Sequence, residues 1–160
     1  MTKNHTSATV ALAVSLLLFL LNPTFAGDEL PITSKGQTVY VPAYSHIYHG
    51  NRESPLLLTV TISIRNISLT HALTVTAVDY YNSQGAVVKK YIDAPFILTP
   101  LGSQRFVVPQ NDEAGGSGAN FIVTWQSAEQ LSPPIIEAVM IGSQNQLGIS
   151  FISRGQATYE

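Results

Sequence analysis

The chain has 160 residues, with eight Lys and Arg, ten Asp and Glu, and no cysteine. The lack of cysteine excludes disulfides, thiol catalysis, thiolate metal ligands and the lipidated cysteine of a bacterial lipoprotein. The formal net charge is −2 and the basic residues are scattered, so the chain offers neither the basic stripe that nucleic acids require nor the polybasic cluster that anionic membranes attract.

Residues 1–26 have the pattern of a secretory signal peptide. Lys3 supplies the positive charge, residues 8–21 form an apolar run, and residues 24–26 form a small-residue cleavage site. The run is shorter than the about 20 apolar residues of a spanning helix, and no other segment approaches that length. We therefore expect an exported, periplasmic protein whose mature chain, residues 27–160, is one domain without a membrane span.

The mature chain reads as short strands separated by turns. Apolar and polar residues alternate most clearly over residues 56–67, and Asn82-Ser83-Gln84-Gly85 predicts the turn of a hairpin. No helical periodicity is apparent, which favours an antiparallel β-sandwich of seven to eight strands, immunoglobulin-like in arrangement, with a small β-barrel as the alternative. The expected strands span residues 38–41, 56–67, 73–81, 86–92, 104–108, 120–125, 135–141 and 146–153.

Four stretches of the mature chain carry a family resemblance: Val39–Ser45, Val78–Tyr81, Gly115–Phe121 and Ile135–Gly142. Together they resemble a family of exported bacterial proteins known as Domain of Unknown Function 3124. The resemblance extends over most of the mature chain and implies an exported single-domain protein. It implies no activity, substrate or cofactor.

The longest polar loop lies between residues 109 and 119, and the strand that follows it carries the only tryptophan, Trp125. Backbone N–H groups of a glycine-rich loop can converge on an anion, whereas neighbouring carboxylates favour a hard cation such as calcium. The spacing matches neither an EF-hand nor a phosphate-binding loop, and a connection without a ligand is the alternative. The predicted binding residues are Asp112, Glu113, Gly115, Gly116, Ser117, Gly118 and Asn120.

His46 and His49 lie three residues apart in an aromatic segment. If that segment is irregular, both imidazoles can reach one copper or zinc ion, and His71 is a third ligand only if the fold brings it close. The alternative is a pair of surface histidines. No other cofactor is indicated.

Asp79 and Glu137 lie in expected strands with apolar neighbours on both sides. An unpaired buried carboxylate is strongly unfavourable, so Arg65 and Arg105 are the expected partners in structural ion pairs. The functional alternative is a paired acid site for general acid–base chemistry.

Ser117 stands between glycines, as the nucleophile of a serine hydrolase does. The Gly-x-Ser-x-Gly elbow fails here because residue 119 is alanine and a strand, not a helix, is expected to follow. The sequence therefore favours a non-catalytic binding or interaction module for an unknown protein or small ligand of the envelope. The alternatives are a metal-binding protein or metal-dependent hydrolase that uses His46 and His49, and a structural component of an envelope assembly.

Overall fold

A computed structural model of the chain describes residues 32–50, 53–144 and 147–159. The predicted signal peptide, residues 1–26, lies outside the described residues. Within this described part, no helix has the length and apolar character needed to cross a membrane.

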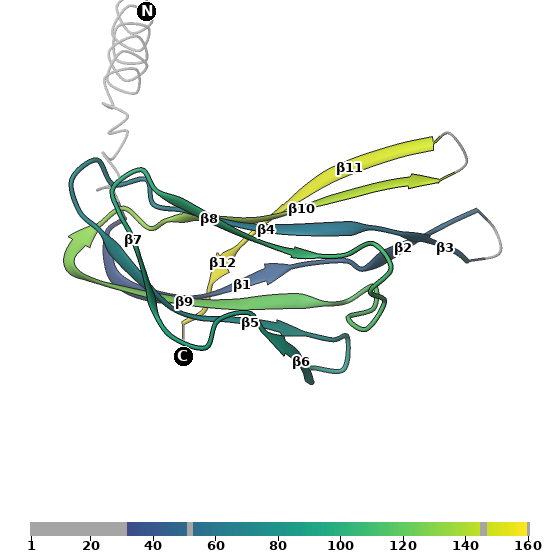
Figure 1. The fold of residues 1–160 in the computed structure, drawn as a ribbon, viewed down its shortest axis with the longest axis horizontal. Coiled ribbons are helices and arrows are strands. Elements are labelled where there is room, and N and C mark those ends of the chain that lie inside the picture. The colour runs from purple at the N-terminus through teal and green to yellow at the C-terminus, as the bar shows by residue number, and fades with distance from the viewer. Residues whose placement is uncertain (1–31, 51–52, 145–146, 160) are drawn as a thin grey trace, which may run out of the picture. The chain divides into compact units, whose positions relative to one another are not determined.

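The described residues form an all-β domain, as predicted (Figure 1). All the strand pairs within its sheets are antiparallel. The strands are β1 (Ser34–Pro42), β2 (His46–His49), β3 (Ser54–Leu57), β4 (Thr59–Arg65), β5 (Leu73–Tyr81), β6 (Val87–Lys90), β7 (Phe96–Leu98), β8 (Ser103–Val108), β9 (Asn120–Leu131), β10 (Ile135–Gln144), β11 (Leu147–Arg154) and β12 (Gln156–Ala157).

Two sheets form the sandwich, and a separate hairpin of β2 and β3 extends from it. The six-stranded sheet has the order β12-β1-β9-β5-β6, with β7 also paired to β5. The four-stranded sheet has the order β11-β10-β4-β8, so β8 and β11 are its edges. Because the described strands end in edges, they form a sandwich and not the closed barrel considered as the alternative.

The core lies between the two sheets because alternate residues of each strand point inward. Trp125, Phe121 and Tyr80 come from the six-stranded sheet, and Ile62 and Met140 come from the four-stranded sheet. None of these five side chains is more than 1% exposed. The burial of each such side chain contributes about 1.5–3 kcal/mol to the stability of the folded state, so the domain can be stable without disulfides.

The predicted hairpin across residues 82–85 is confirmed, since β5 pairs with β6. The long strand predicted over residues 56–67 is divided into β3 and β4. The division occurs at Leu58, whose N–H donates to Ser45 O at 2.9 Å, and it lets β3 pair with β2 while β4 enters the four-stranded sheet. This break and several short strands raise the strand number above the expected seven to eight.

The strand order is immunoglobulin-like at its centre and differs at its margins. The pairs β4–β8 and β5–β9 correspond to the B–E and C–F pairs of an immunoglobulin sandwich. However, the first strand pairs with β9, and β10 pairs with β4. The first strand and the last long strands have therefore exchanged sheets relative to that fold.

Candidate functional site

The glycine-rich loop, residues 109–119, joins β8 to β9 at one end of the sandwich. Ser45 and Ser83 hold it from two sides. The N–H and Oγ of Ser45 both donate to Gly116 O, each at 3.1 Å. The N–H and Oγ of Ser83 both donate to Gly115 O, at 2.9 and 3.1 Å. The loop is thus fastened to the segments that follow β1 and β5.

Some of the loop's own N–H groups are already engaged within the protein. Gly116 N donates to Glu113 O at 3.1 Å, and Gly118 N donates to Ser83 Oγ at 2.9 Å. A backbone anion site needs several free N–H groups that converge on one point. These two glycines cannot supply them without breaking existing hydrogen bonds.

Gly115 is needed where the loop crosses Tyr80. A Cβ atom at Gly115 would collide with Tyr80 Oη and lie 2.5 Å from Tyr80 Cζ. The Tyr80 ring is fully buried, its centroid lies 4.8 Å from that of Phe121, and its Oη has no hydrogen-bond partner among the described residues. Burial and the charge of Asp112 raise the pKa of Tyr80 far above its ordinary value, and the same two causes raise the pKa of Tyr91 to about 12.

The predicted binding residues of the loop therefore divide by accessibility. Gly115 is buried, Gly116, Asp112, Ser117 and Asn120 are half-buried, and Glu113 and Gly118 are exposed. Glu113 is the loop's exposed carboxylate, whereas Asp112 Oδ1 accepts from Ala114 N at 3.1 Å. A binding role for these residues stays a prediction.

His46 and His49 lie on β2, where residues three apart point to opposite faces of the strand. His46 Nδ1 lies 3.2 Å from Ser45 Oγ, and His46 Nε2 lies 3.2 Å from Tyr48 Oη. His71 is in the connection after β4, at the end of that strand far from β2. No group of three or more potential metal ligands occurs within residues 32–50, 53–144 and 147–159. The copper or zinc site stays a prediction.

The structure brings Arg65 and Glu137 together: Arg65 Nε lies 3.8 Å from Glu137 Oε1, and the two side chains are 57% and 16% exposed. Arg105 lies on β8 and makes no salt bridge to any described residue. Asp79 is on the six-stranded sheet, opposite Lys90. It is therefore not brought together with Arg65 or Arg105, which lie on the other sheet.

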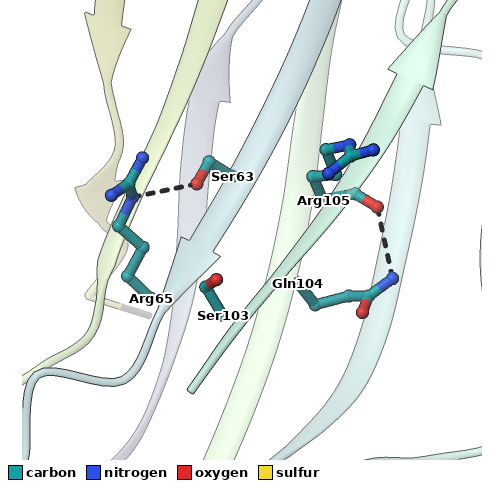
Figure 2. A pocket seen from close by; sticks show the side chains of 5 residues that line it. All are labelled: Ser63, Arg65, Ser103, Gln104 and Arg105. Carbon is teal, nitrogen blue, oxygen red and sulfur yellow. Dashed lines mark hydrogen bonds between the residues drawn. The ribbon is translucent and has the colours of Figure 1, made fainter. Parts of the chain in front are cut away.

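A shallow hollow of about 480 Å³ lies on the outer face of the four-stranded sheet, and we call it the arginine hollow (Figure 2). Ser63 on β4 is opposite Arg105 on β8, and Arg65 on β4 is opposite Ser103 on β8. The two arginines are therefore diagonal neighbours across the strand pair, and so are the two serines. Arg65 Nε donates to Ser63 Oγ at 3.1 Å, while Gln104 Nε2 donates to Arg105 O at 3.2 Å. The lining residues are Ser63, Arg65, Ser103, Gln104 and Arg105.

Chemically, the arginine hollow is rich in hydrogen-bond donors and positive charge. Within the described residues, the guanidinium of Arg105 has neither a salt bridge nor a side-chain hydrogen bond. Guanidinium groups bind carboxylates and phosphates through two parallel N–H bonds, and serine hydroxyls can add further donors. The hollow is therefore suited to an oxyanion.

The model of one family, Protein of unknown function (DUF3124), matches residues 36–158. The chain belongs to this family. No curated protein sequence matches the chain. A solved structure titled "Crystal Structure of Thermotoga maritima 1070" aligns with a TM-score of 0.44 and 11% identity, over 75% of this chain and 92% of that chain. A similarity that distant carries no functional argument.

The DUF3124 match includes both the glycine-rich loop and the arginine hollow. Sequence reasoning identified Arg65 and Arg105 only as ion-pair partners and missed Ser63, Ser103 and Gln104. The sequence signal that could have found these residues is the series of polar residues at alternate positions of β4, which point outward. Its meaning depends on the β4–β8 register, because that register places Ser63 beside Arg105.

Proposed function

We propose that the protein is an exported periplasmic domain that binds a carboxylate-bearing ligand without changing it chemically, and that the arginine hollow is its binding site. One observation carries the proposal: Arg105 lines the same hollow as Arg65, Ser63 and Ser103, and it has no ion-pair partner among the described residues. A carboxylate would satisfy donors that the fold leaves available.

The hollow is open to solvent, which determines the strength of binding that we expect. Exposed ion pairs contribute about 0.2–1 kcal/mol each, so a single carboxylate bound here gains little. A ligand with several carboxylates engages both arginines at once, and two such pairs, worth at most about 2 kcal/mol together, give a Kd on the order of tens of mM. Binding weakens with added salt, because salt screens exposed charges.

Binding is tested with citrate, a small tricarboxylate, by NMR titration of the arginine side-chain Nε–Hε signals. Arg105→Ala is expected to weaken citrate binding about fivefold, which corresponds to the loss of about 1 kcal/mol. Lys90→Ala is the matched control, since it removes the same charge from the exposed surface of the other sheet. Equal losses in the two variants, or no arginine response to citrate, would refute the assignment of this site.

Export is tested separately by mass spectrometry of the protein from periplasmic and cytoplasmic fractions. The pattern of residues 1–26 supports cleavage before Gly27, so the periplasmic chain is expected to begin there. A full-length chain that keeps Met1 and remains in the cytoplasm would contradict export while leaving the binding result intact.

A further inference from the structure

We infer that the whole outer face of the four-stranded sheet is a docking surface for an acidic protein segment in extended conformation. This inference rests on the proposed function and deepens it. The first support is the cross-strand register, which aligns Arg154, Glu137, Ser63 and Arg105 in one row across β11, β10, β4 and β8. With Arg65 beside this charged row, the face collects three of the four arginines in the chain and a single acidic residue.

An apolar row lies next to the charged row. The same register aligns Ile152, Val139, Thr61 and Val107 across the four strands. Ile152 is 58% exposed and Val107 is 42% exposed, so the row has an exposed apolar side chain at each end. Arginine beside exposed apolar groups, without lysine, is the composition of a protein–protein interface.

The charges decide between possible occupants. A second copy packed face to face would set arginines against arginines with only Glu137 of each copy to compensate, so a second copy is disfavoured. Polybasic membrane sites use about 4–8 Lys or Arg, more than this face carries. The described lysines, Lys35, Lys89 and Lys90, all lie on strands of the six-stranded sheet. An acidic protein segment is the occupant that complements the face.

The spacing of the rows specifies the segment. The charged and apolar rows are two residues apart along each strand, which corresponds to about 7 Å. Residues i and i+2 of an extended chain have the same separation and point the same way. A segment that runs along the strands therefore places a Glu or Asp against Arg105 and, two residues later, an apolar side chain against Val107.

The test uses the mature protein and a fluorescein-labelled peptide, Gly-Ser-Glu-Thr-Glu-Thr-Leu-Thr-Ser-Gly, with binding followed by fluorescence anisotropy. Two matched peptides replace both Glu with Gln or the Leu with Ser. We expect the Gln peptide to bind at least tenfold more weakly and the Ser peptide about fivefold more weakly.

Matched protein variants assign the effects to the two rows. Arg105→Ala is expected to weaken peptide binding about tenfold and Val107→Ser about threefold, while Lys90→Ala leaves it unchanged. Val107 is 42% exposed on the edge strand β8, so the Ser variant should fold, and its thermal unfolding is measured alongside.

The outcomes separate this inference from the proposed function. If citrate binds but Leu and Val107 contribute nothing, the hollow is a small-anion site and the docking surface is refuted. If neither citrate nor the peptide binds, both proposals fail. Preferential binding to vesicles of phosphatidylglycerol would overturn the inference in favour of a membrane. A concentration-dependent mass that Val107→Ser abolishes would overturn it in favour of a second copy.

Discussion

The glycine-rich loop and the outer face of the four-stranded sheet show opposite relations between local sequence and available chemistry. The loop concentrates glycines and carboxylates, yet Ser45 and Ser83 fasten it and Gly115 packs on Tyr80. The sheet face is built from ordinary strand residues, yet it leaves Arg105 without a partner in the described domain. A polar group can bind a ligand when the fold leaves it without a hydrogen-bond or ion-pair partner. The polarity of the neighbouring sequence does not show whether it has such a partner.

The largest expected effect tests whether the loop is part of the core. Gly115→Ala should lower the free energy of unfolding by about 1–3 kcal/mol, because the new Cβ collides with Tyr80. Gly148→Ala is the matched control, since a Cβ there meets nothing within 4 Å. Urea unfolding measures both variants, and equal stabilities would mean that the loop is not packed as described.

Tyr80→Phe sharpens this test because it removes the hydroxyl that the alanine at position 115 would strike. The buried Oη has no partner among the described residues, so Tyr80→Phe alone should cost little. Combined with Gly115→Ala, it should recover part of the lost stability. Strict additivity in this double-mutant cycle would show that the two sites do not interact.

Ser83→Ala tests the fastening of the loop with a smaller effect. The Ser83 hydroxyl accepts from Gly118 N and donates to Gly115 O, so its removal should lower the free energy of unfolding by about 1–2 kcal/mol. Hydrogen exchange at the Gly118 amide should accelerate in this variant and not in the exposed control Ser132→Ala. Unchanged exchange at Gly118 would argue against the serine contact.

The tyrosines beneath the loop predict how stability changes at high pH. Burial, with Asp112 nearby, raises the pKa of Tyr91 to about 12, against about 10 for an unfolded chain. As the pH rises, Tyr91 therefore loses its proton in the unfolded state before it does so in the folded state. The stability that Tyr91 contributes is complete below about pH 10 and is lost as the pH rises through about 12. Urea midpoints from pH 8 to 12 should fall less steeply in Tyr91→Phe. The same change in the 87% exposed Tyr159 serves as control, and an identical slope in both variants would contradict the account.

Glu137→Gln gives the smallest effect and concerns the sheet face. Its carboxylate lies 3.8 Å from Arg65 Nε and competes with an incoming acid for that arginine. Removing the charge should strengthen citrate binding about twofold to threefold and change stability by less than about 1 kcal/mol. Weaker citrate binding in this variant would show that Glu137 positions Arg65 for the ligand.

The fold was predictable because its signals are local. The alternation along residues 56–67 and the turn at residues 82–85 predict strands and a hairpin without knowledge of distant residues. The break at Leu58 was not predictable, because it depends on a hydrogen bond to Ser45 from another part of the chain. The strand exchange that places β1 beside β9 is likewise a long-range choice.

The candidate site was only half predictable, for the same reason. Charge alone predicted that Asp79 and Glu137 need Arg65 and Arg105 as partners, and among the described residues only the pair of Arg65 and Glu137 forms. Residues Ser63 and Ser103 join Arg105 only through the β4–β8 register, and a shift of one residue would turn each side chain to the other face. A single sequence does not fix that register.

The most direct test of the central claim is a map of backbone amide shifts as the Glu-containing peptide is added to the mature protein. If the sheet face binds, the largest changes occur at Ser63, Arg65, Ser103 and Arg105, and they disappear in Arg105→Ala while Lys90→Ala retains them. If the largest changes instead occur at residues 112–118 and persist in Arg105→Ala, the loop is the binding site and the account of the sheet face is wrong.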